Sequence, residues 1–192
     1  EVLADMEHTG VRIDTDALAA YSKALTQRLA DIERACIDLA GIQFNVGSPA
    51  QVGEVLFDKL KIDEKAKKTK TGQYSTTEEV LEKLSGKHPI VGKILEFRKI
   101  KKLLSTYVNA LPELINPHTG KIHTTYNQTV TATGRLSSTN PNLQNIPIRN
   151  DDGREIRKAF IPDDGHSFFS ADYSQIELRI VANISKDEAL VA

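Results

Sequence analysis

The first forty residues carry an apolar stripe that predicts one long helix. Apolar side chains recur every three or four residues along it, at Leu18, Tyr21, Leu25, Leu29, Ile32, Cys36 and Leu39. Gly41 follows, in the position where glycine commonly ends a helix. A helix with one apolar stripe packs along another element, so its expected role is scaffolding. Val11 and Ile13 predict a short extended segment before it.

Three further helices are predicted in residues 48–109. The first, over 48–60, opens with Ser48 as N-cap and proline at the first helical position. The second, over 75–84, opens at a serine and a threonine that each have glutamate three residues later. The third covers 89–109 and has apolar residues at helical spacing. Residues 61–74 are rich in Lys, Thr and Gly and predict an exposed loop.

The pattern changes in the last third of the chain. Residues 122–126 alternate and predict a strand, whereas 134–150 predict an ordered loop. Residues 156–161 and 168–171 are interpreted as a hairpin around an Asp-Asp-Gly turn. A helix then follows, and a second helix start is predicted where Asp187 and Glu188 act as caps.

Composition narrows the class of protein only a little. The 192 residues contain 25 basic and 26 acidic side chains, so bulk charge does not indicate nucleic-acid binding. Lys87–Lys102 is nevertheless a basic segment, with Glu96 as its acidic residue. One cysteine excludes an internal disulfide. Without a long apolar run or a signal peptide, we expect a cytoplasmic protein that contacts no membrane.

Asp172 is the first candidate for chemistry. It ends the apolar run 168–171 and directly precedes the predicted helix, where Ser174 and Glu177 have the spacing of a capping box. A strand-to-helix junction can hold one carboxylate rigidly, as a metal-binding phosphoryl-transfer site requires. The same spacing also suits a turn residue followed by an ordinary cap, so spacing alone leaves both interpretations open.

Two segments resemble conserved motifs of the family A DNA polymerases. Residues 172–179 read DYSQIELR and resemble motif A of that family. Residues 131–149 read TATGRLSSTNPNLQNIPIR and are similar to its template–primer segment. Both stand in the order and at the separation found in the family.

This resemblance implies an α+β fold in three regions. Residues 1–44 correspond to a long helix that supports the palm, and 45–115 to a helical thumb. Residues 116–192 correspond to a partial palm with antiparallel strands, which contains motif A and is truncated before the fingers. The resemblance therefore predicts an excised piece of a longer protein.

The resemblance also assigns roles around motif A. It implies that Asp172 is catalytic and bridges two Mg²⁺ ions, with the backbone carbonyl of Tyr173 as a further ligand. The implied nucleotide-binding residues are Gln175, Ile176, Glu177 and Arg149. Glu177 closes the pocket against the ribose 2′-position and so excludes ribonucleotides.

A second set of residues is implied to contact primer–template DNA. Arg135 matches the residue that reaches the minor groove at the primer terminus, where the acceptors are common to every base pair. The template–primer segment adds Asn142, Gln144 and Asn145. The predicted third helix contributes one face, with Arg98, Lys102, Ser105 and Asn109 at spacings of four, three and four. A charged face is commonly only solvated, but the resemblance favours DNA for this face and for the loop lysines Lys67 and Lys68.

The implied function is template-directed DNA synthesis. The parent enzyme extends a primer 3′ end on a DNA template by two-metal phosphoryl transfer from dNTPs, in replication and repair. The family's second catalytic carboxylate belongs to a later motif, so we expect this chain to be inactive without the remainder of the polymerase. Two alternatives stay open: a non-catalytic duplex-binding module, and part of a single-subunit RNA polymerase-like enzyme. Glu177 argues against the second, because an RNA polymerase must accept the 2′-hydroxyl.

Overall fold

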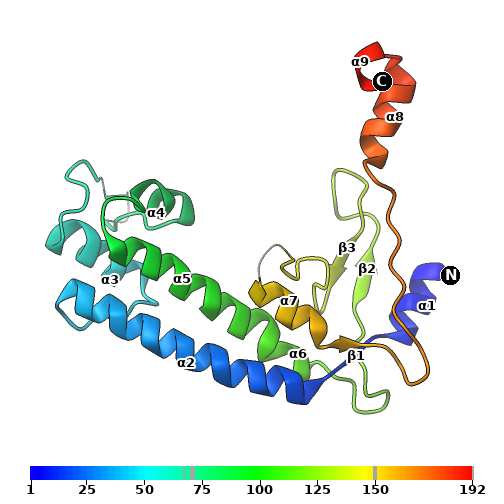
Figure 1. The fold of residues 1–192 in the computed structure, drawn as a ribbon, viewed down its shortest axis with the longest axis horizontal. Coiled ribbons are helices and arrows are strands. Elements are labelled where there is room, and N and C mark those ends of the chain that lie inside the picture. Colours follow the sequence, from blue (N-terminus) through cyan, green and yellow to red (C-terminus); the bar gives the residue numbers. More distant parts are fainter. Residues whose placement is uncertain (67, 70–71, 149–150, 192) are drawn as a thin grey trace. The chain divides into compact units, whose positions relative to one another are not determined.

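The computed structural model describes residues 1–66, 68–69, 72–148 and 151–191, which form two compact units (Figure 1). The first unit is Glu1–Ile161 and the second is Pro162–Ala192. The α+β prediction is confirmed as a mixed, helix-rich fold with two small antiparallel sheets.

The elements of the first unit follow in chain order. They are α1 (Val2–Thr9), β1 (Arg12–Ile13), α2 (Thr15–Ala40), α3 (Pro49–Gly53), η1 (Glu54–Lys59), α4 (Glu78–Leu84), α5 (Pro89–Leu103), η2 (Leu104–Val108), α6 (Ala110–Glu113), β2 (Thr125–Asn127), β3 (Ser137–Thr139), α7 (Asp151–Lys158) and β4 (Phe160–Ile161). The second unit contains α8 (Ile176–Ser185) and α9 (Glu188–Val191). Segments η1 and η2 are π-helical turns that extend α3 and α5.

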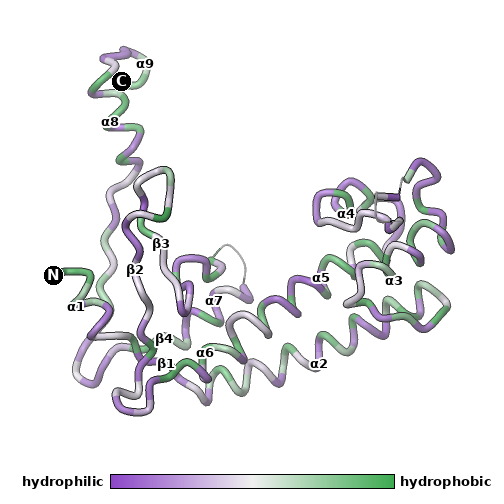
Figure 2. Tube along the Cα trace, turned by 180° about the vertical axis from the view of Figure 1, so that it is seen from behind, coloured by the Kyte–Doolittle hydropathy of each residue, from purple (hydrophilic) through white to green (hydrophobic). Residues whose placement is uncertain are grey.

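Helix α2 confirms the long helix predicted from the apolar stripe. The Asp14 side chain accepts a hydrogen bond of 2.9 Å from the Ala17 amide and caps its start. Gly41 ends it in the left-handed conformation, with φ of 64°. The buried face of α2 packs along α5, and this pair forms the centre of the core (Figure 1). Figure 2 shows apolar and polar positions alternating along both helices, as expected where one face is buried.

The three helices predicted in residues 48–109 agree with the structure except at one start, whereas helices α1 and α7 were not predicted. Residues 48–60 and 89–109 are helical as expected, and Ser48 accepts a hydrogen bond from the Gln51 amide as a cap. The start predicted at Ser75 and Thr76 is wrong, because α4 begins at Glu78. The oxygens of Thr76 are instead acceptors for the Arg98 guanidinium, which holds this residue outside the helix.

Two short antiparallel pairs form the sheets. Strand β1 pairs with β4, with Ile13 opposite Phe160, and β2 pairs with β3, with Tyr126 opposite Ser138. The strand predicted over 122–126 is confirmed in part, since β2 begins at Thr125. Strand β3 lies where an ordered loop was predicted. Its Ser-Ser-Thr sequence has no apolar alternation, and tertiary hydrogen bonds hold it in place.

The hairpin predicted from 156–161 and 168–171 is wrong. The first half of the first segment, residues 156–158, belongs to helix α7, and only Phe160–Ile161 is a strand, paired with β1 near the start of the chain. Residues 162–175 are all described and form turns and irregular backbone without a strand. Phe168 and Phe169 are 61% and 90% exposed, so no neighbouring strand covers this run or supplies its backbone hydrogen bonds.

In the second unit, α8 follows motif A directly but not through the predicted capping box. Gln175 is its N-cap, in the left-handed conformation and without a side-chain cap. The Ser174 carbonyl accepts a hydrogen bond of 2.8 Å from Arg179 Nε, so Ser174 serves the helix through its backbone. The prediction for Asp187 is confirmed, because its Oδ1 accepts from the amides of Ala189 and Leu190 and caps α9. No helix within the described residues combines the length and the apolar character needed to cross a membrane.

Candidate nucleic-acid interface and motif A segment

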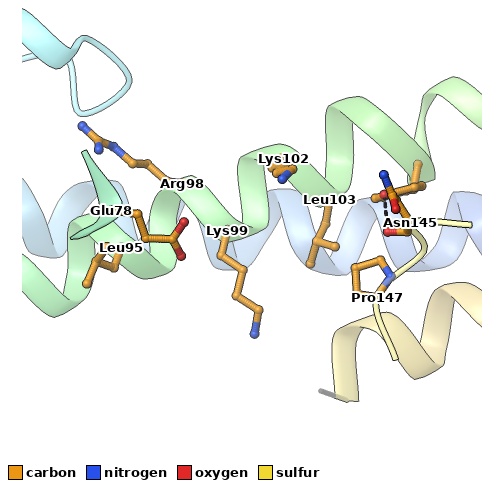
Figure 3. A pocket seen from close by; sticks show the side chains of 9 residues that line it. Glu78, Leu95, Arg98, Lys99, Lys102, Leu103, Asn145 and Pro147 are labelled. Carbon is orange, nitrogen blue, oxygen red and sulfur yellow. Dashed lines mark hydrogen bonds between the residues drawn. The ribbon is translucent and has the colours of Figure 1, made fainter. Parts of the chain in front are cut away.

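A cleft in the first unit lies between α5 and the loop that precedes α7. Its volume is about 260 Å³, and its walls include Arg98, Lys99 and Lys102 from α5, with Asn145 and Pro147 from the loop (Figure 3). A second cleft of about 430 Å³ adjoins it and shares Lys102 and Asn145. The structure thus brings a predicted basic helix face together with the predicted template–primer segment.

The template–primer loop is held by hydrogen bonds to buried hydroxyl groups. Thr124 Oγ1 lies 2.6 Å from Ser138 Oγ and donates to the Pro141 carbonyl at 2.8 Å. The Leu143 amide donates to Ser138 Oγ at 3.1 Å. Thr124 and Ser138 are both buried, so these bonds form away from water, where an unmade bond is costly. The ordered loop predicted here is confirmed outside its strand β3.

The tip of the loop is attached to the helical part by Tyr107. The buried Tyr107 hydroxyl donates to the Asn145 carbonyl at 2.6 Å, and burial raises the pKa of Tyr107. The side chains of Asn142, Gln144 and Asn145 remain exposed. Asn142 Oδ1 also accepts from the Gln144 amide at 3.1 Å, which fixes the turn between the two residues. This arrangement presents amide groups at the surface of an ordered loop.

Arg98 and Lys102 line the same cleft but are differently engaged. The Arg98 guanidinium donates to the Thr76 carbonyl, and to Thr76 Oγ1 at 3.0 Å. Burial lowers the pKa of Arg98, with Glu78 opposing the effect. Lys102 is exposed and lies in both clefts. Lys102 is therefore the side chain of this pair that is better placed to reach a phosphate.

The rest of the predicted basic face continues past the π-helical turn η2. Ser105 Oγ donates to the Lys102 carbonyl at 3.4 Å. Asn109 Oδ1 accepts a hydrogen bond of 2.7 Å from Ser22 on α2. Because a π-turn shifts the register of the helix that follows, the tail of this face is turned towards α2.

Arg135 lies in the exposed turn between β2 and β3. Gly134 before it has φ of 72°, a left-handed conformation that glycine adopts without strain. The Arg135 carbonyl accepts from the Thr131 hydroxyl, which closes the turn. Its side chain is exposed at the surface.

Asp152, which no sequence motif singled out, joins three helices. Its carboxylate accepts from Tyr21 at 3.1 Å, from Arg28 at 3.1 Å and from Lys99 at 3.2 Å. Arg28 also pairs with Glu96 of α5 at 2.6 Å. Burial opposes ionisation of Asp152, but Lys99, Tyr21 and Arg28 outweigh it and hold the pKa of this carboxyl below its ordinary value. The sequence feature that could have indicated Asp152 is the charge pattern of α7, which has acidic residues in its first turn and basic residues in its last turn.

Acid should weaken this network. The Arg28 hydrogen bond lowers the pKa of Glu96, as Lys99 and its neighbours lower that of Asp152. A carboxyl with a lowered folded-state pKa contributes stability above its unfolded pKa and loses it as the pH falls through the folded value. We expect the free energy of unfolding to fall from about pH 5 downward. Urea unfolding at stepped pH should show a smaller fall for Asp152→Asn/Glu96→Gln; an equal fall contradicts the assignment.

Two oxygen groups of motif A are candidates for metal binding, the Asp172 carboxylate and the Tyr173 backbone carbonyl. Asp172 is exposed, and so is Tyr173, at 80%. Within the described part of the chain, no group of three His, Cys, Asp or Glu side chains is close enough to hold a metal ion. Both oxygens are hard donors of the kind that Mg²⁺ prefers, and Mg²⁺ commonly uses one or two carboxylates with substrate phosphates and water. The donor set therefore fits Mg²⁺ as a partial site.

The remaining predicted site residues lie at the start of α8, in the loop after η1, or outside the described residues. Gln175 stands at the turn into α8, and Ile176 and Glu177 follow it on exposed positions of the helix. Lys68 Nζ lies 3.8 Å from Asp58 and 4.9 Å from the centre of the Tyr74 ring. Lys67 and Arg149 fall outside the described residues.

Comparison with known proteins decides the family. The sequence profile of DNA polymerase family A matches residues 15–192. DNA polymerase I of Synechocystis sp. is 56% identical over all of this chain, and that of Geobacillus stearothermophilus is 53% identical over 99% of it. The chain belongs to DNA polymerase family A.

A solved family A structure agrees in fold. The POL domain of Pol1 from M. smegmatis, in complex with DNA primer-template and dNTP, superposes with a TM-score of 0.85 at 45% identity. The match covers 98% of this chain and 33% of that one. The chain spans about a fifth of the length of the curated relatives, 19% for Synechocystis and 22% for Geobacillus. Membership in family A therefore rests on nearly the whole of this chain and on a limited part of each relative.

Proposed function

We propose that this chain is part of a DNA-directed DNA polymerase that extends a primer 3′ end on a DNA template with dNTPs. One observation carries the proposal. Lys102 of α5 shares a cleft with Asn142 and Asn145 of the template–primer segment, although about forty residues separate them in sequence. An exposed lysine can contact the phosphates of DNA, and exposed amide side chains next to it can bond to the sugars and base edges. The M. smegmatis neighbour, which is bound to primer-template and dNTP, supports this assignment.

We assign the regions by analogy with the family. Residues 45–115 serve as the thumb, 1–44 support the palm, and 116–192 form part of the palm. The packing of α2 along α5 suits a rigid arm, because two long helices with a shared core resist bending.

In motif A, Asp172 and the Tyr173 carbonyl are the groups that would hold Mg²⁺. When bound, the metal would supply activation of the primer hydroxyl and neutralisation of the triphosphate charge. Glu177, in the first turn of α8, restricts the sugar 2′-position by its bulk. Gln175 and Ile176 line the nucleotide pocket, and the family resemblance assigns Arg149 to the incoming triphosphate.

The proposed DNA contacts divide by chemistry. Lys102, with Lys67 and Lys68 of the loop, attracts phosphates without reading sequence. Arg135, Asn142, Gln144 and Asn145 offer hydrogen bonds to the minor groove and sugar, where a correct base pair presents acceptors at fixed places. The guanidinium of Arg98 is hydrogen-bonded to Thr76, so Arg98 contributes positive charge near the DNA and no direct phosphate contact. Ser105 extends the surface into η2, and Asn109 follows it at the edge next to α2, where its Oδ1 accepts from Ser22.

Lys102→Ala tests the DNA-binding surface. Fluorescence anisotropy of the chain with a primer–template duplex should show affinity a few-fold weaker and a salt slope lower by about one unit. With one phosphate contact fewer, binding releases one counterion fewer from the DNA, and the dependence of affinity on salt concentration becomes less steep. Lys23→Ala, which removes an exposed lysine on α2, is the matched control. Equal effects of the two substitutions, or an unchanged slope for Lys102→Ala, contradict the assignment.

A further inference from the structure

Asp152 links helix α7 to both long helices of the first unit. Tyr21 and Arg28 reach its carboxylate from α2, and Lys99 reaches it from α5. Its side chain is only 13% exposed, whereas the other ion pairs of α7 lie at the surface. Charged hydrogen bonds to a mostly buried carboxylate are among the stronger polar contacts in proteins. The start of α7 is therefore attached firmly to the helical part.

Helix α7 in turn holds the end of the template–primer segment. Arg157 Nη2 donates to the Ile146 carbonyl at 3.1 Å, and Arg157 Nε donates to the Pro147 carbonyl at 3.2 Å. Gly153 lies so close to this loop that a methyl group on its Cα would meet the Pro147 carbonyl oxygen at 2.4 Å. The fully buried Ile156 anchors the same helix in the core. The loop is therefore hydrogen-bonded to α7 and closely packed against it.

The loop held in this way carries the amides of the proposed DNA surface. Within this loop, the Asn145 carbonyl accepts a hydrogen bond from Tyr107. Asn145 also lines both clefts that contain Lys102. Figure 3 shows Asn145 and Pro147 on the loop beside α5, with Lys99 and Lys102 on the helix. Lys99 belongs both to the cleft wall and to the Asp152 contacts. The position of α7 thus sets how the loop meets α5.

We infer that Asp152 is a positioning residue for primer–template binding: it fixes α7 against α2 and α5, and α7 holds the Asn142–Pro147 loop opposite Lys102. This inference rests on the proposed function, in which that loop contacts DNA. It assigns to Asp152 no contact with DNA or nucleotide. Its effect passes through the two Arg157 hydrogen bonds and the close contact between Gly153 and Pro147.

Amide hydrogen exchange of the 192-residue chain tests the positioning directly. Asp152→Asn keeps the shape of the side chain and removes its charge. We expect exchange to quicken about tenfold in residues 142–148 and in α7, with α2 and α5 unchanged. Glu155→Gln is the control, because Glu155 lies on the same helix and pairs with the exposed Lys158 at 2.5 Å. Unchanged exchange in the loop, or equal quickening throughout α2 and α5, overturns the inference.

Duplex binding and a conservative variant separate positioning from stability alone. At a temperature where every variant is fully folded, Asp152→Asn should weaken primer–template affinity by about fivefold to tenfold, and Asp152→Glu should restore most of it because the carboxylate returns. Affinity that follows the thermal midpoint in all variants overturns the inference. If the unsubstituted chain binds no duplex, the proposed DNA surface fails in this chain. The exchange experiment then still decides whether Asp152 positions the loop.

Discussion

Asp172→Asn is expected to lower nucleotide incorporation by roughly a thousandfold. The experiment needs a complete enzyme, so this chain replaces the matching segment of Geobacillus stearothermophilus DNA polymerase I, which is 53% identical. Asparagine keeps the size of the side chain but removes the negative charge that a hard divalent cation requires. Single-turnover extension of a labelled primer measures the rate, and anisotropy measures duplex affinity. We expect the rate to fall while duplex affinity is unchanged.

Asp187→Asn is the matched control in the same chimera. Asp187 lies in the same unit and its Oδ1 caps α9. Asparagine caps a helix about as well as aspartate, so this variant removes one negative charge without loss of the helix start. Its rate should stay close to that of the unsubstituted chimera. A rate loss shared by both variants, or retained activity in Asp172→Asn, contradicts the metal-binding role of Asp172.

Gly153→Ala is expected to lower the free energy of unfolding of the 192-residue chain by about 3 kcal/mol. The added methyl group would lie 2.4 Å from the Pro147 carbonyl oxygen and 2.6 Å from its carbon, which belong to backbone and not to a flexible side chain. Either α7 or the loop must shift, with strain on the Arg157 hydrogen bonds. Urea unfolding followed by circular dichroism measures the change.

Gly92→Ala provides the comparison, because Gly92 also lies within a helix. Apart from its chain neighbours and the backbone of its own helix, no atom of the described residues lies within 4 Å of the Cβ that this substitution adds. Alanine is the better helix former, so the free energy of unfolding should rise by up to about 1 kcal/mol. If Gly153→Ala is as stable as Gly92→Ala, then α7 is not packed against the Pro147 backbone as described.

Local signals account for the helices that could be predicted. The stripe from Leu18 to Leu39 and the stop at Gly41 lie within one segment, and so do the caps at Ser48 and Asp187. Each needs only neighbours along the chain, through helical periodicity or a side chain that bonds a nearby amide. The family resemblance came from contiguous motifs as well, and the family profile over residues 15–192 agrees with it.

Apart from the start of α8, the errors arose where a partner lies far away in sequence. Phe160 was expected to pair in a local hairpin, but it pairs with Ile13. Ser138 lies in a strand because its hydroxyl group is hydrogen-bonded to Thr124 and Pro141. Thr76 lies outside the predicted helix because its oxygens accept hydrogen bonds from Arg98. Apolar alternation reports which face is buried, but it does not report which distant atom satisfies a backbone or hydroxyl group.

The sequence by itself determined the long helix α2 and the helices of residues 48–109, the family, and the types of residue available for DNA and metal contact. Only the tertiary structure decided that Lys102 meets Asn145 in one cleft and that Arg98 is committed to Thr76. It also decided that Asp152 joins α2, α5 and α7. The physical reason is that helix formation and motif identity depend on short stretches of chain. Clefts and buried charge networks depend on which distant segments pack together, and that is settled by the burial of the whole unit.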